Sequence, residues 1–111
     1  GGAIVPGPRL AAKALALYTA KLPEVTVARP RRVVGRDTVA CIRAGLYWGY
    51  LGMIERILKE SLREMRTPDA AVILTGGLAP LFARRIPGAR HVPDLTLQGL
   101  RLAFERLEVK C

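Results

Sequence analysis

Residues 38–65 constrain the fold of this 111-residue chain more than any other segment. Apolar side chains recur there with helical spacing, and Asp37, immediately before the segment, is a good helix N-cap. The first half is apolar almost all round, with Arg43 as its only charged side chain. Because a helix that is apolar on every side has to be covered, the sequence predicts one long helix packed against a substantial partner.

Glycines and charges add detail to this helix. Glu55 and Lys59 are one turn apart in its amphipathic second half, where the spacing predicts an ion pair on the solvent face. Gly45, Gly49 and Gly52 each cost about 1 kcal/mol relative to alanine inside a helix. Two interpretations of these glycines stay open: close packing of another helix, or the close approach of a ligand.

Shorter elements surround the long helix. The patterns predict, in order, a strand end at 1–5, a helix at 8–20, an edge strand at 24–28, strands at 70–74 and 90–92 with a helix at 80–86 between them, and a last helix beginning near Asp94. The side chains expected to face inward are Leu10, Ala14, Leu17 and Tyr18 in the first helix and Leu97, Leu100, Leu102 and Phe104 in the last. Strands that alternate with helices predict a layered α/β domain.

The charge balance is strongly basic. There are 18 Lys and Arg residues against 9 Asp and Glu residues, a net charge of +9, which suits nucleic acid, an anionic membrane surface or small anions. The one basic cluster has no interleaved aromatic side chain on which bases could stack, so nucleic acid is the less favoured partner; it comprises Arg29, Arg31, Arg32 and Arg36. No uncharged stretch is long enough to span a bilayer. The two cysteines are far apart, which makes a reducing cytoplasm the expected location.

Two short motifs could contact ligands. Thr75, Gly76 and Gly77 follow the predicted strand at 70–74, and ligands bind at the carboxyl ends of parallel strands. Glycines there let a backbone approach a nucleotide, although the same turn is common without any ligand. At the start of the long helix, free N–H groups, Arg36 and the hydroxyl of Thr38 suit an anion, or form a plain N-cap.

Several components of an active site are missing from the sequence. It has no Walker-type phosphate loop, and His91 is its only histidine. Asp37 and Asp94 look like helix caps rather than catalytic carboxylates. We therefore assign no catalytic residue and no metal ligand, and expect the chain by itself to lack a complete active site.

Five motifs in register resemble those of one family. They are GGAIVPG at 1–7, TAKLP at 19–23, GRDT at 35–38, TGGLA at 75–79 and DLTLQGL at 94–100. Together they resemble the C-terminal portion of type III pantothenate kinase, and the resemblance covers essentially the whole chain. It implies a ribonuclease-H-like α/β lobe of the acetate and sugar kinase/Hsp70/actin superfamily, incomplete at its N-terminus, with residues 1–111 as the C-terminal lobe of a two-lobed kinase.

The resemblance also implies an activity and its participants. Such an enzyme phosphorylates pantothenate with ATP in the first step of coenzyme A synthesis, needs Mg²⁺ and a monovalent cation (K⁺ or NH₄⁺), and works as a homodimer. Thr38 matches the threonine of the family's Gly-x-Asn-Thr motif, which contacts pantothenate, and Asp37 stands where that motif has asparagine. Thr75, Gly76 and Gly77 match the adenosine-binding segment, and the glycine-bearing helix is expected near the dimer interface.

The chain departs from the family in one large respect. The family's phosphate loop, its catalytic base and the aspartate that places the monovalent cation would all precede Gly1. We therefore expect a fragment that is inactive alone and that needs the N-terminal lobe as its partner. The alternative is a non-catalytic regulatory or nucleic-acid-binding module of the Bvg accessory factor type. A steep salt dependence of DNA binding would support this alternative.

Overall fold

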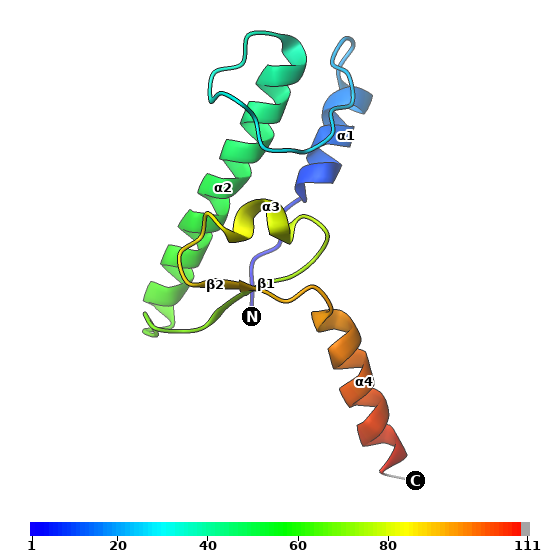
Figure 1. Cartoon of the computed structure of the whole chain (residues 1–111), viewed down its shortest axis with the longest axis vertical. Coiled ribbons are helices and arrows are strands. Elements are labelled where there is room, and N and C mark those ends of the chain that lie inside the picture. Colours follow the sequence, from blue (N-terminus) through cyan, green and yellow to red (C-terminus); the bar gives the residue numbers. More distant parts are fainter. Residues whose placement is uncertain (110–111) are drawn as a thin grey trace. The chain divides into compact units, whose positions relative to one another are not determined.

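The computed structural model describes residues 1–109, which divide between two compact units. The units are Gly1–Asp69 and Ala70–Cys111. The first holds α1 (Pro8–Tyr18) and α2 (Thr38–Glu64), and the second holds β1 (Val72–Leu74), α3 (Ala79–Ala83), β2 (Ala89–His91) and α4 (Leu95–Glu108) (Figure 1). The predicted α/β class is confirmed at this level.

The long helix α2 begins and ends where the sequence predicts, to within one residue. Its 27 residues start after Asp37, whose Oδ1 accepts a hydrogen bond from the N–H of Ala40 at 2.8 Å. At the other end Arg66 adopts a left-handed conformation with φ 54°, and the N–H of Thr67 donates to the carbonyl of Leu62 at 3.1 Å. Both ends therefore satisfy backbone groups that a helix leaves without partners.

The core of the first unit lies between α1 and the first half of α2, which run alongside each other (Figure 1). It consists of Ala12, Val25, Ile42 and Leu46, with partly buried side chains around them. Full burial of a side chain the size of leucine stabilises a fold by about 1.5–3 kcal/mol, so these few contacts hold the unit together.

The inward face predicted for α1 is wrong. Leu10, Leu17 and Tyr18 are 59%, 75% and 87% exposed, whereas Ala12 is buried and Leu15 packs against the core. An apolar side chain is buried only where another element covers it, and α2 covers the face of α1 that carries Ala12 and Leu15.

The two strands predicted in the first unit, at 1–5 and 24–28, do not form. A strand needs a neighbouring strand to pair its backbone N–H and C=O groups, and the described residues of this unit form none. Val25 is nevertheless 4% exposed, so the apolar signal at 24–28 marked a core contact rather than a strand.

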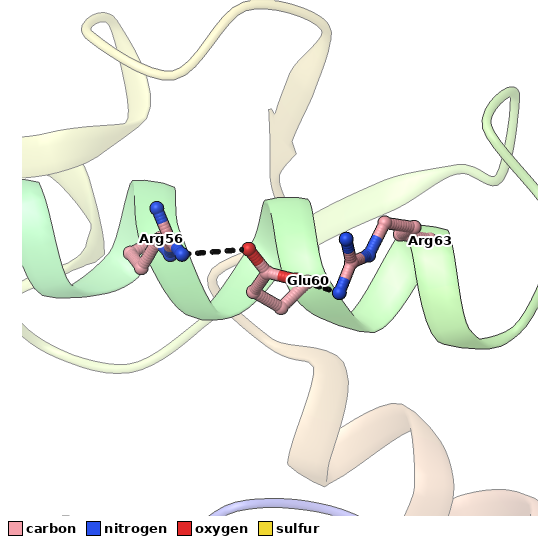
Figure 2. A network of polar contacts seen from close by, with 3 residues as sticks. All are labelled: Arg56, Glu60 and Arg63. Carbon is pink, nitrogen blue, oxygen red and sulfur yellow. Dashed lines mark ion pairs between the residues drawn. The ribbon is translucent and has the colours of Figure 1, made fainter.

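The solvent face of α2 carries two ion pairs, and neither is the predicted one between Glu55 and Lys59. Figure 2 shows Glu60 between Arg56 and Arg63, with both N···O distances at 3.0 Å. The two arginine side chains are mostly exposed, so each pair contributes no more than about 1 kcal/mol. The pairs that form have the same i,i+3 and i,i+4 spacing, with arginine as the partner on both sides of Glu60.

The second unit contains a two-stranded parallel sheet. β1 and β2 pair from Val72 opposite Ala89 to Leu74 opposite His91, and the N–H of Val92 extends the ladder to the carbonyl of Leu74 at 2.9 Å. The chain passes from β1 to β2 through α3, in which Phe82 is buried. Parallel strands require such a crossover, and the predicted strand–helix–strand order is confirmed.

The apolar face predicted for α4 is not buried in this chain. Leu97, Leu100 and Phe104 are 68%, 62% and 61% exposed, and Leu102 is 53% exposed. No other described element of the second unit packs along α4 (Figure 1), so the inward orientation expected for these side chains is wrong here. Among the described helices, none has a stretch long and apolar enough to cross a membrane.

Candidate functional site

The first candidate contact is the start of α2. Thr38 is the first residue of the helix, and its side chain is exposed. Asp37 precedes it with extended backbone angles, φ −139° and ψ 169°, and caps the helix through Ala40. The N-cap interpretation of Asp37 is thus confirmed, and the hydroxyl of Thr38 lies at the positive end of the helix dipole.

Gly35 fixes the loop that leads into this helix. A Cβ atom at Gly35 would lie 2.4 Å from the backbone nitrogen of Cys41 and 2.6 Å from the carbonyl carbon of Ala40. Real Cβ atoms do not come that close to backbone, so only glycine lets the loop pack onto the first turn of α2. The loop therefore packs directly against the helix start.

A basic hollow opens beside this arrangement. It has a volume of about 390 Å³, and five arginines line it together with Asp37 and a few small or apolar residues. We call it the arginine pocket and define it by Arg29, Arg31, Arg32, Arg36 and Arg43. The basic cluster seen in the sequence supplies four of these arginines, and Thr38 is not one of the lining residues.

Arg43 is the residue of this pocket that the sequence reasoning did not assign. It lies on α2, one and a half turns beyond Asp37, and its Nε donates to the carbonyl of Thr26 at a long 3.4 Å. One signal could have found it: a lone charge in an otherwise apolar helix half has to face solvent or other polar groups.

The second candidate contact is the turn after β1. Gly76 has φ 97°, a conformation that side-chain-bearing residues rarely adopt, and its carbonyl accepts a hydrogen bond from the N–H of Ala79 at 3.1 Å. Thr75, Gly76 and Gly77 are all exposed between β1 and α3. The structure thus brings these three predicted residues together at the carboxyl end of a parallel strand, while Thr38 belongs to the other unit.

The remaining polar candidates form no further centre. Within residues 1–109 no three His, Cys, Asp or Glu side chains gather closely enough to hold a metal ion. Asp94 precedes α4 as predicted, but its Oδ1 accepts a hydrogen bond from the side chain of Gln98 at 2.8 Å instead of a backbone N–H. Cys41 is an exposed free thiol.

The glycines of α2 are open in this chain. Apart from the neighbouring backbone of α2 itself, no described atom lies within 4 Å of where a Cβ would stand on Gly45, Gly49 or Gly52. No described helix therefore packs closely against these three glycines.

Comparison with known proteins adds an independent observation. The family model described as type III pantothenate kinase matches residues 1–60, the part that contains the GRDT motif and the start of α2. Several curated proteins with the same name are similar over nearly the whole chain.

Three relatives give the scale of this similarity. The type III pantothenate kinase of Paramagnetospirillum magneticum is 48% identical over 101 residues, which are 90% of this chain and 38% of the relative. That of Cereibacter sphaeroides is 47% identical over 95% of this chain and 41% of the relative. That of Rhodospirillum rubrum is 44% identical over 96% and 41%. The chain therefore spans about two fifths of the length of these relatives, and it belongs to the type III pantothenate kinase family.

Proposed function

We propose that this chain forms the pantothenate-contacting and adenosine-contacting part of a kinase that transfers a phosphoryl group from ATP to pantothenate. The product is 4′-phosphopantothenate, and the reaction is the first step of coenzyme A biosynthesis. The observation that carries the proposal is the GRDT motif at a capped helix start, inside the segment that the family model matches. Relatives that are 44–48% identical bear the name of this activity.

Thr38 is proposed to hold pantothenate. Its exposed hydroxyl can donate to a carbonyl or carboxylate oxygen of the substrate, and the free N–H groups of the first turn of α2 strengthen that preference for oxygen. Asp37, which replaces the family's asparagine, already accepts the N–H of Ala40. Aspartate and asparagine are equally good N-caps, so the substitution keeps the helix start intact.

Gly76 and its neighbours are proposed to lie against adenosine. The left-handed turn at Gly76 exposes backbone without a Cβ, so a flat purine or a ribose can approach it closely. Thr75 adds a hydroxyl at the same strand end. Strand ends of parallel sheets are the usual ligand sites of α/β folds, which supports the assignment.

Other features of the proposal come from the family. They are a ribonuclease-H-like lobe of the acetate and sugar kinase/Hsp70/actin superfamily, an N-terminal lobe as partner, a homodimer, and a cytoplasmic location. The open stripe of Gly45, Gly49 and Gly52 leaves room for a second helix in such a dimer. Mg²⁺ and K⁺ or NH₄⁺ would neutralise phosphate charge in the reaction. No group of three or more His, Cys, Asp or Glu residues in 1–109 fits a metal ion. No step of the reaction is therefore assigned to a metal held by residues 1–109.

A chimera tests the proposed activity. The matching 101 residues of the Paramagnetospirillum magneticum relative are replaced by this chain, and ADP release is measured with and without pantothenate. We expect pantothenate-dependent ADP release from the chimera and none from the 111-residue chain alone. A chimera that is folded, has the relative's sedimentation coefficient and shows no activity would contradict the proposal.

Two variants of the chimera separate the two contacts. Thr38→Val removes a hydroxyl and keeps the shape, so we expect the KM for pantothenate to rise about tenfold or more, with little change for ATP. Gly76→Ala strains the turn and places a methyl group in the nucleotide's path, so the KM for ATP should rise instead. Equal effects of both variants on both substrates would show that neither residue holds its assigned ligand.

A further inference from the structure

We propose that the arginine pocket binds a small oligophosphate, a ligand in which two or more phosphoryl groups lie close together. The pocket lies on the first unit, beside the start of α2. The proposal does not depend on the kinase activity, since neither Thr38 nor the turn at Gly76 lines this pocket.

The charge in the pocket is not compensated within the described part of the chain. Five arginines and one acidic residue, Asp37, line the pocket, and the carboxylate of Asp37 is itself engaged by the N–H of Ala40. Ion pairs among residues 1–109 include those of Arg56, Arg63 and Arg101, and none of these arginines belongs to the pocket. Like charges gathered without counter-charges repel one another, so an anion that bridges them is strongly favoured.

The arginines that line the pocket come from two elements. The contact of Gly35 with the first turn of α2 fixes the loop that carries Arg31, Arg32 and Arg36. Arg43 comes from α2 itself. The pocket therefore combines charges from the loop with a charge from the helix.

The size and lining of the pocket select the class of ligand. A volume of about 390 Å³ is at the small end of the range for ligand sites, enough for a compact molecule and not for a helix or a duplex. Arginine forks bind phosphate oxygens in pairs, so several of them match several phosphoryl groups. No aromatic side chain lines the pocket, so it offers no platform for a base. The phosphates themselves are the part that is recognised.

Inorganic pyrophosphate is the probe, titrated calorimetrically into the 111-residue chain in about 0.1 M salt without divalent metal ions. We expect one binding site, with orthophosphate at least about tenfold weaker because it engages fewer guanidinium groups. ADP should bind within a few-fold of pyrophosphate if only the phosphates are recognised. Binding of ADP that is tighter by more than about tenfold, and that Gly76→Ala leaves unchanged, would overturn recognition without a base.

A matched pair of variants decides whether the pocket is the site. Arg31→Gln with Arg36→Gln removes two pocket charges, and both side chains are exposed. Arg9→Gln with Arg90→Gln removes the same charge from exposed positions outside the pocket. We expect the first pair to weaken pyrophosphate binding at least tenfold and the second pair to change it less than twofold, with circular dichroism unchanged in both.

Three results would overturn the proposal. If the wild-type chain binds no pyrophosphate, the pocket is not a site for it. If the two variant pairs lose equal pyrophosphate affinity, net charge alone attracts the anion. A single-stranded oligonucleotide that binds with a steep salt dependence and is not displaced by pyrophosphate would make the basic face a nucleic-acid surface instead.

Discussion

Gly35→Ala is expected to destabilise the first unit by about 3 kcal/mol or more. The added Cβ would lie 2.4 Å from the backbone nitrogen of Cys41 and 2.7 Å from its Cα, so it cannot be relieved by the rotation of a side chain. Either the loop or the first turn of α2 has to move. Trp48, the only tryptophan, lies on α2 and reports the transition, so urea unfolding followed by its fluorescence gives the change in midpoint.

The control for this prediction is another glycine-to-alanine change in the same unit. Gly49 lies inside α2, and nothing described lies within 4 Å of where its Cβ would stand. Gly49→Ala should therefore raise the free energy of unfolding by up to about 1 kcal/mol through helix propensity. A Gly35→Ala variant with the wild-type midpoint would show that the loop does not pack onto α2 as described.

Leu46→Ala is the second change with a large expected effect. Leu46 is 7% exposed in the core that joins α1 to α2, and its truncation leaves a cavity among Ala12, Val25 and Ile42. Such a change costs about 2–5 kcal/mol, from the lost apolar transfer free energy and from the cavity. The measurement is again urea unfolding followed by Trp48 fluorescence.

Leu17→Ala is the matched control. Leu17 lies on α1 and is 75% exposed, and leucine and alanine have similar helix propensities. Its truncation should change stability by less than about 0.5 kcal/mol. If Leu17→Ala were the more damaging of the two, the face of α1 that the sequence predicted as buried would be the one that packs.

Structural features whose sequence signals all lie within one segment were predicted well. α2 was recognisable because its cap, its periodicity and its length all lie in one stretch, and each favours the same structure. The strand before Thr75 was recognisable because a short, wholly apolar run bounded by turn residues is typical of a parallel strand. The residues assigned to substrate and nucleotide lie at the ends of these two elements, so their positions followed from the elements.

Features that depend on a second segment could not be predicted. Which face of α1 is buried depends on where α2 lies, and a helical pattern by itself does not tell a covered apolar face from an open one. The leucines of α4 show the same limit, because their spacing predicts burial and no described element covers them. The sequence showed only a cluster of four arginines at the arginine pocket, because Arg43 joins them only through the fold.

Gly35 also indicates how a pocket of this kind can be recognised in distantly related sequences. Basic residues are common in loops and are easily exchanged for one another, so their recurrence says little about shape. The single hydrogen of Gly35 allows the loop to rest on Cys41 and Ala40, and the geometry of the surrounding arginines is inherited from that contact. A distant chain that kept every arginine but carried a larger residue at this position would present the same charge without the hollow.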